Sequence, residues 1–259
     1  MTKQPGILRS GNKFKTNMTS LEFLKYSKTH ERVVHDASYY KPKRDENGDP
    51  VKHFNGSASA VKGLRVCFQN LMDYTDSRFT GRLMKIATEI YKRDSEGEHC
   101  KKSVYFSRQR GFLGTLRFNI RLNNIEIFTF SLNQLHSEDR TEATLIAKEF
   151  LLRQCYVPAS TTHFRIIHQL SIISDFAFSE YHQCYEPLSK LSGMSVIAYS
   201  DYTPVKSVMN EEIKVSFPEG TILSEDDSVI QCVGVEFNMP SANSFKELKG
   251  SGVKVANVY

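Results

Sequence analysis

The stretch from Ser57 to Asp94 has the only long and unambiguous helical period in the chain: SASAVKGLRVCFQNLMDYTDSRFTGRLMKIATEIYKRD. Apolar residues recur at steps of three and four, as on one face of an amphipathic helix. They are Val61, Leu64, Phe68, Leu71 and Met72, then Phe79, Leu83, Ile86, Ala87 and Ile90. The polar break at residues 74–77 offers Asp76 or Ser77 as a helix cap, and Ser57 or Ser59 can cap the start. The stretch therefore predicts two consecutive helices, a helical hairpin over residues 57–103.

The segment before this hairpin, residues 1–56, is polar, basic and poor in apolar side chains. Pro42, Gly48 and Pro50 surround the polar run DENGD, a strong turn signal. A segment of this kind buries too little apolar area to offset its own chain entropy. We expect a basic extended arm that is ordered by another surface, either the rest of the chain or a neighbouring subunit.

After Ser103 the period changes to short runs rich in β-branched and aromatic residues, separated by Pro and Gly turns. Asn123-Asn124 is a plausible turn of a β-hairpin. The run from Ala143 to Leu152 could form either a strand or a helix. The expected strands are Val104–Arg108, Leu113–Leu122, Ile125–Ser131, Ala143–Leu152, Phe164–Phe178, Met194–Tyr202, Glu212–Phe217, Ser228–Met239 and Val253–Val258. Many short strands without helices between them favour an antiparallel β-sandwich over residues 104–259, immunoglobulin-like or jelly-roll-like, and an α+β fold class overall.

The net charge of +5 conceals a strong asymmetry along the 259 residues. Residues 1–121 contain 24 Lys and Arg against 12 Asp and Glu, a net charge of +12. Residues 122–259 contain 10 against 17, a net charge of −7. Such a split suggests a polyanion on the basic half, or a partner, possibly another copy, that presents an acidic face. The simpler alternative is that both halves are only solvated.

Local motifs for catalysis, cofactors or metals are absent from the sequence. There is no nucleotide-binding glycine motif and no G-x-S-x-G elbow. His182-Gln183-Cys184 has a metal-like spacing, but a tetrahedral site usually needs a second local pair. Five widely spaced cysteines predict reduced, partly buried thiols. We therefore expect no enzyme, no catalytic residue, no cofactor and no metal.

Targeting signals are also missing from the pattern. No run of 18 or more apolar residues is present, so no membrane span is expected. The N-terminal residues lack the apolar core of a secretory signal peptide. The expected location is the cytoplasm, or an assembled particle.

A nucleic-acid-binding function is one hypothesis from the basic half. Arg108, Arg110, Arg117 and Arg121 alternate with Tyr105, Phe106, Phe112 and Phe118. Cations among aromatic rings serve phosphate contact and base stacking. Strand alternation alone, however, also places aromatic residues inside and Arg outside.

A non-enzymatic structural subunit is the favoured hypothesis. A basic arm, a helical hairpin and a sandwich of opposite charge suit a homo-oligomer that assembles into a filament, sheath or phage-like particle, by strand addition at a sheet edge or by contact of basic and acidic faces. The candidate assembly contacts are Ile7, Leu8, Arg9, Lys13, Phe14, Lys15, Arg78 and Arg82. The simpler interpretation is a solvated tail and a solvated helix face.

One resemblance follows from the motifs themselves. The string GSASAVKGLRVCFQNLMDYTDSRFTGRLMKI, with Lys62-Gly63-Leu64-Arg65 and Arg82-Leu83-Met84, is followed by Val233–Phe237 and a terminal strand at Val253–Val258. In these features the chain resembles a group of uncharacterised bacterial proteins of similar length. The resemblance implies a helical hairpin followed by a C-terminal β-sandwich, and it implies no activity.

Overall fold

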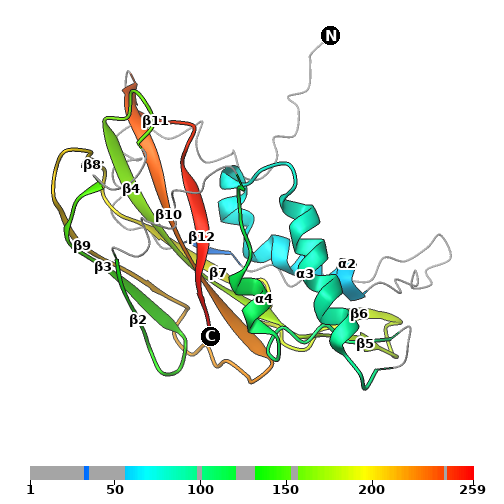
Figure 1. Ribbon diagram of the computed structural model, residues 1–259. Coiled ribbons are helices and arrows are strands. Elements are labelled where there is room, and N and C mark those ends of the chain that lie inside the picture. Colours follow the sequence, from blue (N-terminus) through cyan, green and yellow to red (C-terminus); the bar gives the residue numbers. More distant parts are fainter. Residues whose placement is uncertain (1–31, 35–55, 98–100, 121–131, 153–156, 242–243) are drawn as a thin grey trace, which may run out of the picture.

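The structure is a computed structural model, and it describes residues 32–34, 56–97, 101–120, 132–152, 157–241 and 244–259 (Figure 1). Helices and antiparallel sheets are both present, which is compatible with the predicted α+β class. The expected hairpin turn at Asn123-Asn124 and the expected strand Ile125–Ser131 lie outside the described residues. The division of the chain at residues 56/57 and 103/104 stays a prediction.

The two predicted helices are present on either side of the predicted break. α2 spans Gly56–Cys67 and α3 spans Phe79–Arg93, and a 3-10 helix, η2, spans Gln69–Tyr74 between them. At the break, Oδ1 of Asp76 accepts a hydrogen bond of 2.8 Å from the backbone N–H of Arg78. The N-cap of α3 is nevertheless Arg78, and no side chain caps the helix, so the predicted cap at Asp76 or Ser77 is wrong.

The described strands form three antiparallel sheets. In the largest, β1 (Arg32–Val34), β7 (Ser195–Tyr199), β4 (His163–Ser174), β10 (Asp227–Ser241) and β11 (Ser244–Glu247) follow in spatial order. β12 (Gly252–Val258) also pairs with β10, and β8 (Thr203–Pro204) with β4. β4 and β10 pair over 12 residues, from Asp227↔Ser174 to Asn238↔His163, and form the centre of this sheet.

The two smaller sheets lie at different places around the large one. β2 (Asn133–His136), β3 (Glu142–Phe150) and β9 (Met209–Ser216) form a three-stranded sheet. β5 (Phe176–Ser179) and β6 (Cys184–Pro187) form a two-stranded hairpin below the helices in Figure 1. β3 covers most of the segment that also had helical character, because its pairing with both β2 and β9 outweighs local propensity.

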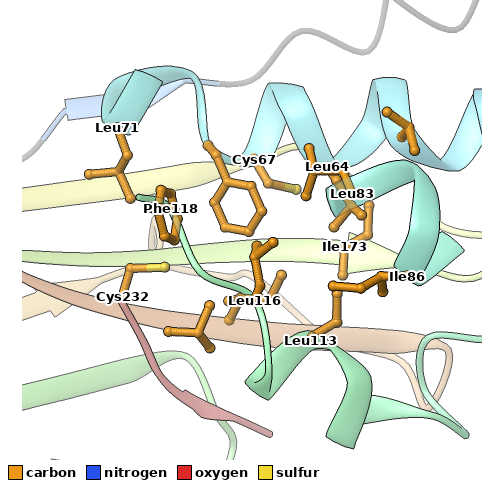
Figure 2. Close-up of a cluster of buried hydrophobic side chains, with 14 of the residues drawn as sticks. Leu64, Cys67, Leu71, Leu83, Ile86, Leu113, Leu116, Phe118, Ile173 and Cys232 are labelled. Carbon is orange, nitrogen blue, oxygen red and sulfur yellow. The ribbon is translucent and has the colours of Figure 1, made fainter. Parts of the chain in front are cut away.

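Alternation along β4 divides the hydrophobic core between the two faces of the large sheet. Ile167 and Ile173 pack with the helices in one cluster, and Ile166 and Ile172 pack with β3 and β9 in another. Figure 2 shows the helix-side cluster, where Leu64 of α2 and other helical side chains converge on the sheet. Both faces of β4 are therefore covered, which explains why every residue of the strand after His163 is buried, the polar ones included.

The segment after Ser103 departs from the expected strands. Residues Arg110–Gly114 form a short helix, α4, and only isolated bridges occur at Val104 and Arg117. Leu113 and Leu116 are buried in the helix-side cluster. Their spacing of three residues suits a helical turn that packs between α3 and β12. Burial of these side chains outweighs the local preference of the segment for a strand.

Candidate assembly interface

One edge of the large sheet is closed by a strand from the predicted arm. β1 pairs antiparallel with β7, with Arg32 opposite Ile197, Val33 opposite Val196 and Val34 opposite Ser195. The pairing is only three residues long. β1 is thus a short edge strand supplied by residues far upstream in the sequence.

β7 itself is held firmly by the body of the protein. It pairs along its whole length with β4, from Ile167↔Tyr199 to Ser171↔Ser195. Gly193 enters the strand with φ +94°, and its N–H donates to the carbonyl of Ile172 over 2.8 Å. Val196 is fully buried against the three-stranded sheet. β7 is therefore a rigid strand whose outer backbone groups would be unpaired without β1.

A buried ion pair lies beside the end of β7. Nη2 of Arg165 is 2.9 Å from Oε2 of Glu236, and the Tyr74 hydroxyl donates to the same carboxylate over 2.6 Å. The Arg165 guanidinium lies over the Tyr199 ring at 4.1 Å. Burial, and next the charge of Glu236, raise the pKa of Tyr74, so the phenol stays protonated and donates. This cluster joins η2 to β4, β7 and β10.

No local motif reveals this cluster, because its members are distant in sequence. The signals were one charged residue within each of two strand segments, Arg165 and Glu236. A buried charge usually has a partner. A search for opposite charges on adjacent apolar strands could have found the pair.

The structure places the two predicted helix contacts differently. Arg78 is exposed just before α3. Arg82 is bound within the chain: it pairs with Asp76 at 3.0 Å and donates to the carbonyls of residues 117 and 118, each at 2.7 Å. The six candidate contacts of the arm, Ile7, Leu8, Arg9, Lys13, Phe14 and Lys15, lie outside the described residues.

Three of the four candidate nucleic-acid contacts can be located, and Arg121 lies outside the described residues. Arg108 is exposed and lies over the Tyr105 ring at 4.2 Å. Arg110 is partly buried, and its Nε donates to the Ser228 hydroxyl over 3.4 Å. Arg117 is exposed next to the bridge with β12.

The aromatic partners of these arginines differ in exposure. Phe106 and Phe118 are fully buried, so neither ring is available for base stacking. Phe112 is half-buried under the Arg93 guanidinium at 4.9 Å, and Tyr105 is half-buried too. Burial of the two Phe rings agrees with the structural interpretation of the alternation.

In the described part of the chain, no group of three or more His, Cys, Asp or Glu could hold a metal ion, and no helix there is long and apolar enough to cross a membrane. Cys67, Cys184 and Cys232 are buried free thiols, as predicted for them. Cys100 and Cys155 lie outside the described residues.

Comparison of the chain with protein-family models, with curated proteins and with solved structures found no match. The candidate interface therefore depends on the geometry above alone.

Proposed function

We propose that this protein is a non-enzymatic structural subunit that assembles with copies of itself. Its arm supplies β1 to the β7 edge of a neighbouring copy, in place of that copy's own β1. The assembly is a filament, a sheath or a phage-like particle.

The observation that carries this proposal is the origin of β1. Residues 32–34 belong to the basic arm, yet they form the outermost strand of the large sheet next to β7. A short strand within an arm can pair equally well with the same edge on another copy, because main-chain hydrogen bonds are the same within and between chains. Exchange of this kind joins copies without any new surface.

The rest of the chain suits a rigid body in such an assembly. In this proposal the seven-stranded and three-stranded sheets act together as an antiparallel sandwich, with helices on the outer face of the larger sheet. The basic residues 1–121 and the acidic residues 122–259 carry net charges of +12 and −7, so the arm of one copy is attracted to the body of the next.

Strand exchange is testable with two variants of the full chain, each of which carries one added cysteine. A chain with Val33→Cys is mixed with a chain with Val196→Cys under oxidising conditions, and mass spectrometry identifies the disulfides. The two positions face each other in the β1–β7 register, so a 33–196 disulfide in this mixture forms only between copies. The matched control replaces Val196→Cys by Lys148→Cys, an exposed position on β3.

Size-exclusion chromatography and negative-stain electron microscopy of the full chain complete the test. We expect large species that Val33→Pro reduces to monomers, because proline removes a backbone donor and resists a strand position. Lys28→Pro, outside β1, is the control. A monomer at every salt and protein concentration, or a 33–196 disulfide no more abundant than the 33–148 control, would refute the proposal.

Nucleic-acid binding through the basic half is the alternative, and it stays a prediction from charge. A gel shift that weakens steeply with salt would support it. The burial of Phe106 and Phe118 makes it the weaker of the two proposals.

A further inference from the structure

A surface cavity lies between the loop that precedes β7 and the loop that joins β9 to β10. Its volume is about 600 Å³. Its charged lining residues are Glu219, Asp226 and Asp227 against Lys190, so carboxylates exceed cations by two. Leu188 and Ile222 also line it, and they are 51% and 85% exposed. The cavity thus combines negative charge with uncovered apolar side chains.

Asp227 supplies a second and independent indication of a ligand. The residue is fully buried and lines the cavity, and its Oδ1 has no hydrogen-bond partner among the described residues. Its Oδ2 is satisfied by the backbone N–H and the hydroxyl of Ser224, at 2.9 and 2.8 Å. A buried carboxylate oxygen without a donor is costly, and a donor brought by a ligand would remove that cost.

The β9–β10 wall of the cavity is fixed in place by Arg140. Arg140 has φ +62°, a left-handed backbone that is unusual for a residue with a side chain. Its guanidinium donates to the carbonyl of Asp227 over 2.7 Å and to that of Ser224 over 2.9 Å. Because these bonds use backbone oxygens, they do not satisfy Oδ1 of Asp227.

We infer that this cavity binds residues 1–21 of a neighbouring copy, an inference that rests on the proposed self-assembly. This segment contains Lys3, Arg9, Lys13 and Lys15 and no acidic residue, with Ile7, Leu8 and Phe14 among the cations. Ammonium and guanidinium groups match the carboxylates, and the apolar side chains match Leu188 and Ile222. The chemistry of the occupant is thus a cationic segment with interspersed apolar residues.

Zero-length carbodiimide cross-linking of the full chain tests this inference. Isotopically light and heavy protein are mixed, assembled and cross-linked, and mass spectrometry locates the bonds between lysines and carboxylates. We expect Lys3, Lys13 or Lys15 to be joined to Glu219 or Asp226, with one light and one heavy partner. Bonds that join only partners of the same label, or lysines joined to other carboxylates, overturn the inference.

Charge reversal at the rim gives a second readout. Glu219→Lys with Asp226→Lys should abolish these cross-links and raise the concentration needed for half-assembly roughly tenfold, the equivalent of about 1.4 kcal/mol. Glu138→Lys with Glu212→Lys is the matched control, since both residues are exposed on or beside the three-stranded sheet and the charge change is the same. Equal effects of the two pairs overturn the cavity as the docking site.

The two proposals can fail separately. If the 33–196 disulfide forms between copies but the lysines do not reach Glu219 or Asp226, the cavity inference falls and the strand exchange stands. If neither the disulfide nor mixed-label cross-links form, both fall.

Discussion

Acid is expected to destabilise this protein through one buried histidine, His168 on β4. The side chain is fully buried, with Nδ1 3.0 Å from the carbonyl of Ile213 and Nε2 3.0 Å from Nε2 of Gln231. The carbonyl can only accept, so Nδ1 carries the proton. Oε1 of Gln231 accepts from Tyr259 over 2.6 Å and from Asn257 over 3.0 Å, which orients the Gln231 amide with its N–H toward Nε2. A second proton on the imidazole would therefore oppose a donor.

The size of this loss of stability follows from the pKa of His168. Burial lowers this pKa from 6.5 to about 4, and the hydrogen bond to Ile213 offsets burial only in part. The pKa of His168 is lower in the folded state than in the unfolded state. The contribution of the neutral imidazole to the free energy of unfolding is therefore fully present above pH 6.5 and is lost as the pH falls toward 4. The full difference corresponds to about 3.4 kcal/mol, of which about 2 kcal/mol is lost by about pH 5.

Urea denaturation of the wild type and of His168→Gln at about pH 7.5 and about pH 5 measures this effect. Glutamine has no proton to gain, and both proteins share every other titrating group. Between the two pH values the wild type should lose about 2 kcal/mol more than the variant. A difference between the two proteins that does not change with pH would refute the reasoning, even if the variant is less stable throughout.

Three further perturbations test the packing. Gly234→Ala should lower the free energy of unfolding by about 1–3 kcal/mol, because its Cβ would lie 2.6 Å from a carbonyl oxygen of β12. The control Gly81→Ala, whose Cβ meets nothing within 4 Å, should raise that free energy by about 0.5–1 kcal/mol. Equal urea midpoints for the two variants would contradict this. Glu236→Gln should cost about 3–5 kcal/mol, because the buried Arg165 loses its counter-charge; an unchanged thermal midpoint would show that the pair is unimportant. Phe118→Ala should cost about 3–5 kcal/mol, since the ring is fully buried; calorimetry checks this, and a loss under about 1 kcal/mol would place the ring outside the core.

The candidate interface could be predicted only in outline. The composition of residues 1–56 predicts an arm that needs another surface, and residues 32–34 of this segment pair with β7. Nothing in the local sequence marks residues 32–34 as the paired piece, since a run of three residues has no detectable period. Arg82 shows the same limit: its position on α3 is predicted, but its bonds to the carbonyls of residues 117 and 118 depend on a segment distant in sequence.

The sequence by itself determined the features that depend on near neighbours. The step of three and four between Ser57 and Asp94 leads to α2 and α3, and the runs separated by turn signals after residue 131 lead to the strands. Period and turn chemistry act over a few residues, so they can be read directly from the chain.

Only the tertiary structure decided which distant segments meet. It turned Arg110–Gly114 into α4, paired Arg165 with Glu236, and brought the loops around Leu188 and Asp227 together into one cavity. The physical reason is that burial and strand pairing reward any apolar or extended partner, so a local pattern specifies a face but not what covers it. The partner is selected by the packing of the whole chain.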